Sequence, residues 1–267
     1  MNSTHGHISP ATPRILVAAG SDPTAGAGLQ ADLKVITALG GHALTAVTAV
    51  TVQDTARVLS VYPMPAELVA AQMRAVLADV GADAIKLGML ADAAIVAAVV
   101  GVLNEHPRLP VVADPVLRGS GGGTLLDGPG AACLLESLLP RVNLLTPNLP
   151  EAAALTGLPP LDSPQLRAEA ARRLLRRGVG AVLITGGHGT GEMIEDWLFT
   201  GEEQHCFRTP RLDLGPGVHG SGCQLASAAA WALACGHSLP QAVAMALCVT
   251  RERLLRASPL GGGQRLL

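Results

Sequence analysis

The segment of residues 216–223 brings glycines, a serine and a cysteine together just before an Ala- and Leu-rich stretch of helical character. Gly220, Ser221 and Gly222 can present backbone N–H groups to an anion, and a helix that begins there adds free amides and the positive end of its dipole. The pKa of a thiol is lowered most readily in the first turn of a helix, so Cys223 is predicted to act as a base near neutral pH. An anion cradle beside a proton acceptor favours phosphoryl transfer to a hydroxyl. The alternative is a glycine turn followed by a small buried thiol.

The composition is that of one globular α/β domain. The chain has 267 residues, of which 49% are apolar and 15% charged, and its mean hydropathy is +0.37. This is ample material for a core. Five scattered cysteines without metal-binding spacing fit a reducing cytoplasm, and the four besides Cys223 are expected to be small core residues. Residues 1–13 lack the apolar region of a signal peptide and are expected to form a flexible tail before a single domain of residues 14–267.

The charge pattern argues against two classes of partner. The net charge is −2 and no basic run occurs, so nucleic acid is not an expected partner. The arginine pairs at residues 172–173 and 176–177 have helical spacing and indicate a solvated helix face. Residues 214–250 contain no Asp, Glu, Lys or Arg, but Gly236 and Pro240 divide them into two helices shorter than the roughly 20 residues of a membrane span. Two buried helices are therefore expected there, and no membrane partner.

Apolar runs of strand length alternate with segments of helical periodicity, which predicts a mostly parallel sheet covered by helices on both faces, with a hairpin at one edge. Strands are expected at residues 14–20, 42–52, 84–88, 111–113, 142–145 and 181–184, the hairpin near 194–199 and 205–208, and helices at 29–39, 65–80, 92–105, 129–139, 163–177, 219–235 and 239–256, with a short one ending at 155. Ligands bind at the carboxyl ends of the strands in such a fold. Those ends carry Ser21, Asp22, Gln53, Asp54, Lys86, Asp114, Asn148, Glu151, Thr185 and His188.

Residues 20–34, Gly-Ser-Asp-Pro-Thr-Ala-Gly-Ala-Gly-Leu-Gln-Ala-Asp-Leu-Lys, resemble the N-terminal signature of the hydroxymethylpyrimidine and phosphomethylpyrimidine kinases of thiamine biosynthesis. Further segments resemble that family in the same order: residues 48–55, 86–90, 114–117, 146–152 and 219–223. The last has cysteine where most sugar kinases of the same superfamily have aspartate. The resemblance implies a ribokinase-like fold and ATP-dependent phosphorylation of 4-amino-5-hydroxymethyl-2-methylpyrimidine and its monophosphate.

The resemblance also implies a pyrimidine pocket formed by Gly20, Asp32, Gln53, Met89 and Val116. An aminopyrimidine presents a donor amine beside an acceptor ring nitrogen, and a glutamine amide can answer both. Asp32 can accept a hydrogen bond from the substrate, and Met89 suits the face of a flat ring. The alternatives are a solvated helix carboxylate for Asp32, a turn residue for Gln53 and an ordinary core residue for Met89.

For the nucleotide, the resemblance implies ATP with Mg²⁺ held by Asp114 and Glu151, directly or through waters. Further nucleotide contacts are expected from Asn148, Glu151, Thr185, Gly187 and Lys86. Asn148 and Glu151 also fit a helix capping pair, and the two roles can coexist. Gly220–Gly222 would hold the migrating phosphoryl group while Cys223 takes the proton of the substrate hydroxyl. Because phosphate charge repels a thiolate, Cys223 is expected to ionise only as transfer proceeds.

The chain departs from the family pattern at three places. Thr185 stands where a lysine is common, and the loop after Asp114 has Ser120 where another lysine is often found. The segment at residues 214–217 lacks the usual Asn/Thr pattern. Arg118 is therefore expected to take over a phosphate contact. These changes affect the nucleotide contacts and leave the reaction class intact.

Two other functions remain open. A pyridoxal kinase of the same superfamily also phosphorylates a hydroxymethyl group on an aromatic heterocycle. A catalytically silent protein that only binds the pyrimidine is the second alternative, favoured by the changes at Thr185 and Ser120. A homodimer is expected by analogy with the family. No fused thiamine-phosphate synthase domain is expected at this length.

Overall fold

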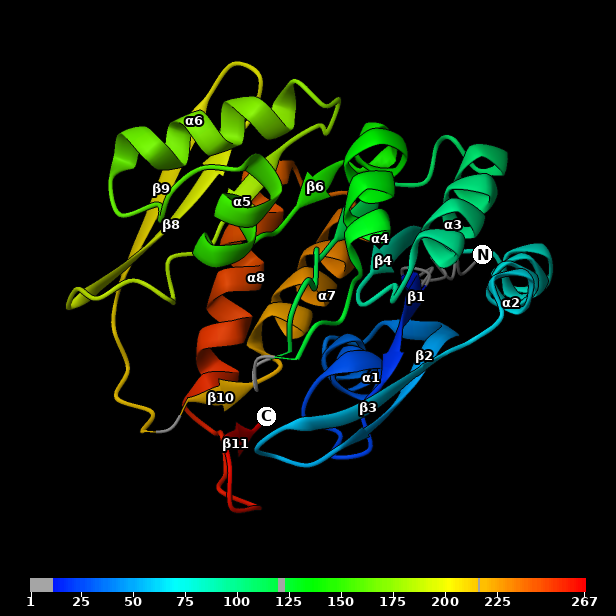
Figure 1. Cartoon of the computed structure of the whole chain (residues 1–267), viewed down its shortest axis with the longest axis horizontal. Helices are drawn as coiled ribbons and strands as arrows, with labels where there is room; N and C mark the ends of the chain where they lie inside the picture. Colours follow the sequence, from blue (N-terminus) through cyan, green and yellow to red (C-terminus); the bar gives the residue numbers. More distant parts are fainter. Residues whose placement is uncertain (1–11, 120–122, 216) are drawn as a thin grey trace, which may run out of the picture.

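The computed structural model describes residues 12–119, 123–215 and 217–267. Nine strands form one sheet in the order β3-β2-β1-β4-β5-β6-β7-β8-β9. β1, β2 and β4 to β7 run parallel, whereas β3 at one edge and β8 and β9 at the other are antiparallel to their neighbours (Figure 1). The predicted α/β class, the mostly parallel sheet and the β8–β9 hairpin at one edge are confirmed. The expected tail falls mainly on residues 1–11, which lie outside the described residues, as do Ser120 and Pro216.

The strands are β1 (Arg14–Ser21), β2 (His42–Gln53), β3 (Val58–Pro63), β4 (Ala84–Leu87), β5 (Val111–Ala113), β6 (Leu144–Leu145), β7 (Val182–Ile184), β8 (Met193–Phe199), β9 (Gln204–Pro210), and a separate parallel pair, β10 (Val218–His219) and β11 (Arg265–Leu266). The sequence analysis missed β3, β10 and β11. β3 lies at the sheet edge and is not fully buried at any position, so it shows no hydrophobic alternation. Strands of two residues are too short to show a pattern.

Helices cover both faces of the sheet. One face carries α1 (Gly28–Ala38), α7 (Ser221–Ala234) and α8 (Leu239–Leu254), and the other carries α2 (Ala66–Asp79), α3 (Ala93–Glu105), α4 (Gly128–Cys133), α5 (Leu149–Thr156) and α6 (Pro164–Leu175). β4 and β5 are buried at every position between the two layers. This explains the continuous apolar run of β5, whereas β4 contains the buried Lys86. The predicted helix at 129–139 is wrong in detail: α4 stops at Cys133, and a π turn and a 3₁₀ turn follow up to Arg141. Pro140, which has no N–H, lies in that irregular stretch.

Two close main-chain contacts fix the starts of α7 and α1. Its N-cap, Gly220, has φ +83°, and a Cβ there would overlap the backbone of Gly26. Gly28 has φ +57°, and a Cβ there would overlap the carbonyl oxygen of Gly20. The end of β1, the start of α1 and the start of α7 therefore touch main chain to main chain, which only glycine allows.

Gly220→Ala tests this approach, with Gly236→Ala as the matched control. Both glycines have φ +83°, but a Cβ at Gly236 would meet no atom within 4 Å. Gly236→Ala should therefore cost only the left-handed backbone strain, about 1–2 kcal/mol of unfolding free energy. Gly220→Ala should cost at least about 1 kcal/mol more, because main-chain atoms must also move apart. Chemical denaturation measures both, and equal losses would contradict the contact.

Candidate active site

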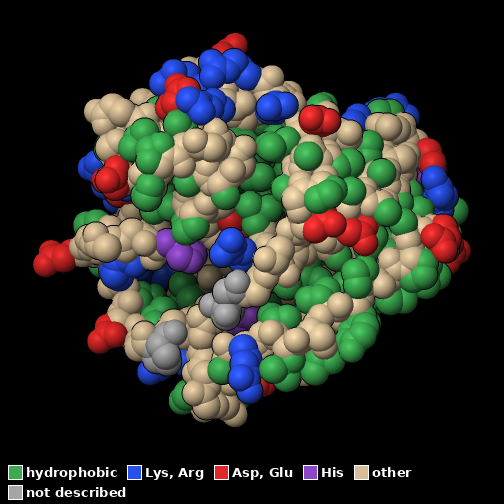
Figure 2. Space-filling view, in the orientation of Figure 1, with side chains coloured by type: hydrophobic (Ala, Val, Ile, Leu, Met, Phe, Trp, Pro, Cys, Tyr) green, Lys and Arg blue, Asp and Glu red, His purple; other side chains and the backbone are tan. Residues whose placement is uncertain are grey.

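Two adjoining cavities open where the parallel strands end. The first has a volume of about 650 Å³ and lies over the ends of β1 and β2, while the second, of about 840 Å³, lies between the β7–β9 side of the sheet and α8. Figure 2 shows this face of the molecule hollowed between α5 and β10, with histidine and Lys or Arg side chains at the rim. The residues that line both cavities are Asp114, Asn148, Glu151, His188, Val218, Ser221, Gly222 and Gln264.

The structure divides most of the predicted site residues between the two cavities and the junction where the cavities meet. Gly20, Gln53, Met89 and Val116, predicted for the pyrimidine, line the first cavity together with Gly220 and Cys223. Thr185 and Gly187, predicted for the nucleotide, line only the second. Asp114, Asn148, Glu151, Ser221 and Gly222 line both and mark the junction. Among the described residues predicted for the site, the two that line neither cavity are Asp32 and Lys86.

The expected ligand contacts of Asp32 and Lys86 need correction. Both side chains are completely buried, and Lys86 Nζ lies 2.9 and 2.8 Å from the two carboxylate oxygens of Asp32. Ser227 on α7 also donates to Asp32, at 2.8 Å. Their hydrogen-bonding groups are therefore engaged with one another beneath the cavities. Lys86 lies inside a strand that is buried on both faces, and its side chain points to the helix layer rather than to the strand end.

Sequence reasoning gave no role to the pair Asp22 and His219, which the structure places in the wall of the first cavity. His219 Nε2 lies 3.0 Å from Asp22 Oδ2 and 2.7 Å from Gln53 Nε2. Burial alone would raise the pKa of Asp22, but hydrogen bonds from His219, Thr24 and Ala27 lower it. The pair thus links the turn after β1 to the predicted pyrimidine contact on β2. Both residues stand inside quoted motifs, but a contact across 197 positions leaves no local sequence signal.

Cys223 lies in the first turn of α7, as predicted, but its pKa is not lowered. Burial, joined by the negative charges of Asp114 and Asp32, raises the pKa of the Cys223 thiol to about 12. The positive charge of Lys86 and a hydrogen bond from the Gly28 amide oppose this shift without overcoming it. The prediction of a thiolate base near neutral pH is therefore wrong for the ligand-free protein, because desolvation outweighs the stabilisation of the thiolate by Lys86 and the Gly28 amide.

The buried Asp114 and the half-buried Glu151 form a carboxylate pair at the junction of the cavities. Burial raises the pKa of Asp114 to about 6, and burial together with the charge of Asp114 raises that of Glu151 to about 8. A divalent cation would relieve both effects, so the residues fit the expected Mg²⁺. In the described part of the chain no cluster of three His, Cys, Asp or Glu residues is set to hold a metal ion. This is compatible with magnesium, which keeps several waters and takes phosphate oxygens as ligands.

The capping alternative for Asn148 and Glu151 is also present. Asn148 Oδ1 accepts from the Glu151 amide at 2.9 Å, and Glu151 Oε2 accepts from the Asn148 amide at 3.0 Å. This reciprocal pair fixes the start of α5 at the junction. It engages one carboxylate oxygen of Glu151 with the backbone, and the side chain still lines both cavities.

The second cavity contains polar groups that the sequence analysis did not identify. Asp196 is buried and accepts from the Gly186 amide at 2.8 Å, and burial raises its pKa to about 6. Arg211 also lines this cavity and donates to the carbonyl oxygen of Gly187 at 2.8 Å. By contrast Arg118, the expected substitute for a missing lysine, lines the first cavity.

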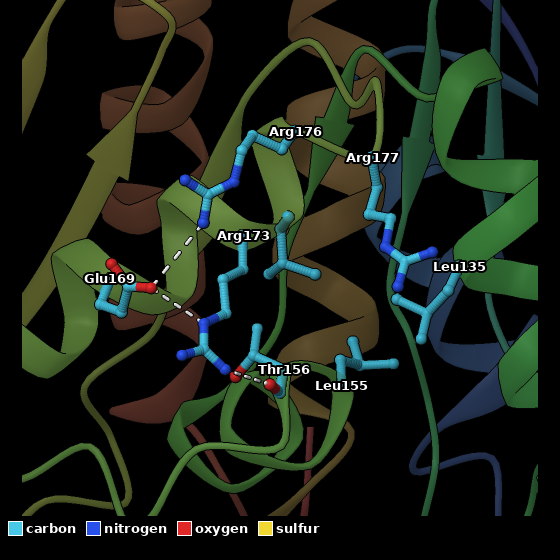
Figure 3. Close-up of a pocket in the computed structure, with 8 residues that line it drawn as sticks. Leu135, Leu155, Thr156, Glu169, Arg173, Arg176 and Arg177 are labelled. Atoms are coloured by element: carbon cyan, nitrogen blue, oxygen red, sulfur yellow. Dashed lines mark hydrogen bonds and ion pairs between the residues drawn. The ribbon is translucent and has the colours of Figure 1, made fainter.

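A third hollow, of about 490 Å³, shares no lining residue with either cavity in the parts of the chain described. It lies between α6, the end of α5 and Leu135, with Arg173, Arg176 and Arg177 around it (Figure 3). Glu169 lies 2.9 Å from Arg173 and 3.8 Å from Arg176. The arginines are exposed, which confirms the predicted solvated helix face.

Two further expectations have mixed outcomes. All five cysteines are free, but Cys235 and Cys248 are exposed, and Cys133 and Cys206 are only half-buried, so the expectation that these four lie in the core is wrong. No helix in the described residues has the length and apolar character to cross a membrane. The charge-free stretch instead forms α7 and α8, which pack against each other on one face of the sheet.

The chain is similar to known proteins of one kinase family and to a solved kinase structure. The phosphomethylpyrimidine kinase family model matches residues 22–266. The chain is 45% identical to the hydroxymethylpyrimidine/phosphomethylpyrimidine kinase of Escherichia coli over 215 residues, 80% of each chain. It is 43% identical to the thiamine biosynthesis bifunctional protein ThiED of Geobacter sulfurreducens over 93% of this chain, and spans about half of that protein's length. A solved ADP complex of Bacillus subtilis pyridoxal kinase has a similar fold, with a TM-score of 0.87 at 30% identity over 96% of this chain and 97% of the other.

Asp196→Asn tests the cost of the buried carboxylate in the second cavity. The pKa of Asp196 is about 6 in the folded protein and about 4 when unfolded, so the folded state binds more protons between these values. Stability must therefore fall as pH rises from 4 to 6. Asp196→Asn should raise the unfolding free energy at pH 7 by up to about 3 kcal/mol, with the gain vanishing below pH 4.

The matched control is Asp83→Asn. The hydrogen bond from Arg14 lowers the pKa of Asp83, so its contribution is present at neutral pH and disappears on acidification. Asp83→Asn should therefore reduce stability at pH 7 and have little effect in acid, the opposite of Asp196→Asn. Urea denaturation across pH 3–8 measures both. A pH-independent effect of Asp196→Asn would contradict the raised pKa.

Proposed function

Because the chain belongs to the phosphomethylpyrimidine kinase family, we propose that it transfers a phosphoryl group from ATP to the hydroxyl of 4-amino-5-hydroxymethyl-2-methylpyrimidine and then to the resulting monophosphate. The family is one of phosphotransferases of thiamine biosynthesis with a ribokinase-like fold. The observation that carries the proposal is the junction of two cavities. Asp114, Glu151 and Gly222 line both, so two ligands seated in the two cavities would meet at a carboxylate pair and a helix N-terminus.

The first cavity suits a small flat heterocycle. Gln53 offers both an amide donor and a carbonyl acceptor to an aminopyrimidine edge, and Met89 offers a polarisable wall. Gly20 leaves room beside that wall, because a Cβ there would lie 3.0 Å from Met89 Cε. His219 Nε2 lies 2.7 Å from Gln53 Nε2, a contact that restricts the orientation of the Gln53 amide before the ligand arrives.

The start of α7 carries the chemistry. Backbone amides of Gly220, Ser221 and Gly222 and the positive end of the α7 dipole would stabilise the charge of the migrating phosphoryl group. Asp114 and Glu151 would hold Mg²⁺, which supplies charge neutralisation at the phosphate oxygens when bound. Cys223 lines the first cavity and would take the proton of the substrate hydroxyl. Its raised pKa supports ionisation only in the loaded complex, where a cation offsets the charge of Asp114.

A pyridoxal kinase is the second candidate. The similarity to the solved pyridoxal kinase favours it, because the two chains share a fold over nearly their whole length at 30% identity. Gln53 and Met89 favour the pyrimidine, as does the family match. Parallel assays with the hydroxymethylpyrimidine and with pyridoxal distinguish the two. Binding of the pyrimidine without turnover of ATP would instead indicate the silent binding protein.

The homodimer and the cytoplasmic location stay predictions. Exposed apolar side chains on neighbouring strands β2 and β3 support a dimer, since such a surface is available for a second copy; they are Val50, Val52, Leu59 and Tyr62. Five free cysteines are compatible with a reducing compartment.

Cys223→Ala tests the proton transfer. Incubation of the wild-type protein with ATP, Mg²⁺ and the hydroxymethylpyrimidine should give mono- and diphosphate products, identified by mass spectrometry. Cys223→Ala should lower kcat by roughly 10²–10⁴ and leave nucleotide binding mostly intact, because the thiol lines only the first cavity. Cys248→Ala, at an exposed position of α8, is the control and should turn over normally. Near-normal turnover of Cys223→Ala would remove Cys223 from the base role.

Arg211→Ala and Arg118→Ala test which arginine replaces the missing lysine charge. Arg211 lines the second cavity, so its loss should raise the KM for ATP roughly tenfold and leave the KM for the pyrimidine unchanged. Arg118 lines the first cavity, so Arg118→Ala should raise the KM for ATP less. An unchanged KM for ATP in either variant counts against a phosphate contact of that arginine.

A further inference from the structure

The Asp32–Lys86 ion pair is completely buried and lines neither of the two cavities. Both side chains have no exposed surface, and Lys86 Nζ contacts both carboxylate oxygens of Asp32. The chain has only two lysines, and the other, Lys34, is exposed on α1. A fully buried lysine in a chain so poor in lysine needs an explanation, since it contacts neither cavity.

The pair joins three elements that carry the site. Lys86 projects from β4, Asp32 from α1, and Ser227 of α7 donates to Asp32 at 2.8 Å. Ser227 follows Cys223 by four residues, so it lies one turn below the thiol on the same face of α7. On the sheet side, the residue after Lys86 is Leu87, whose carbonyl accepts from the Asp114 amide at 2.9 Å.

Stability alone does not account for the pair. Removing two charges from water costs several kcal/mol per ion, and apolar residues of the same volume often serve a core equally well. Gly88, directly after β4, leaves room for the ammonium group, because a Cβ there would lie 2.9 Å from Lys86 Nζ.

The hydrogen bond from Ser227 to Asp32 ties α7 to this pair one turn after Cys223, close to the amides at the helix start. Phosphoryl transfer depends mainly on positioning and on fixed charges that face the phosphate oxygens.

We propose that the Asp32–Lys86 pair is a positioning element of the phosphoryl-transfer site. Through Ser227 it fixes the start of α7 over β4 and β5, where the backbone amides of the helix would meet the phosphoryl group. Lys86 acts without touching either ligand. This inference rests on the proposed kinase function.

The test replaces the pair by apolar residues in the double variant Asp32→Leu/Lys86→Met, which also removes the hydrogen-bond acceptor of Ser227. The core should tolerate the exchange, so the thermal unfolding midpoint should stay within a few degrees of wild type. The KM values for ATP and the pyrimidine should change less than about threefold, while kcat should fall at least about tenfold, because only the transfer step depends on the exact position of the helix start. Val17→Ala is the control: Val17 is buried on β1 beside Lys86 and carries no charge. It should lose stability and keep its kcat.

Wild-type kcat in the double variant would overturn the proposal, as would an equal loss of kcat in Val17→Ala at an equal loss of stability. Should the double variant fail to fold, Ser227→Ala decides, because it removes the tie to α7 and keeps the ion pair. Its kcat should fall two- to fivefold at unchanged KM, and a wild-type kcat would overturn the proposal. A wild-type protein without turnover would count against the proposed function alone.

Discussion

The main-chain contact between Gly220 and Gly26 is the constraint on which the site depends. It sets the start of α7 against the turn after β1 at a separation that any side chain would prevent. This position brings the amides of α7 to the edge of the sheet where β5 delivers Asp114, and it puts Cys223 in the wall of the first cavity. The contact of Gly28 with Gly20 fixes α1 in the same way, so two helices and one strand meet as backbone. The arrangement of backbone amides that would bind the phosphoryl group therefore depends on these contacts between segments, and the glycine motif alone does not produce it.

Burial governs the electrostatics of the site. It raises the pKa of Cys223, of Asp114 and of Glu151, and in the two carboxylates and the thiol the neighbouring negative charges act in the same direction. In the ligand-free site the charged forms of the thiol and the carboxylates, which phosphoryl transfer requires, are therefore disfavoured. The positive charge of Lys86 partly offsets this effect from within the protein, and a nucleotide-bound cation would offset it from the cavity side. The thiol and the two carboxylates would therefore become charged only when the ligands bind. This suits an enzyme that must not activate water in the absence of substrate.

The sequence predicted the layers, the parallel strands and the residues at strand ends well, because these follow from hydrophobic periodicity and from the polar residues that end each run. Gln53, Met89, Asp114 and Glu151 lie at the cavities for that reason. Lys86 was misplaced because β4 is buried on both faces, so alternation cannot tell which way a side chain points. Asp32 was misplaced because its partner Lys86 is 54 positions away, so no local pattern shows the ion pair. The pKa of Cys223 was misjudged because a motif shows the helix dipole and not the depth of burial. The contact of Asp22 with His219 could not be seen at all, since it depends on the tertiary fold.

The distance along the chain between these partners has a consequence for synthesis. Asp22 and His219 are 197 positions apart, and Asp32 and Ser227 are 195 apart. Until α7 has left the ribosome, the face of β4 and β5 that it covers stays exposed, and the carboxylate of Asp32 lacks one of its partners. The nascent chain therefore carries an uncovered part of its sheet until this late helix is made, and its folding is completed by non-local contacts that form slowly. Rapid overproduction should burden chaperones more than the small size of this enzyme suggests.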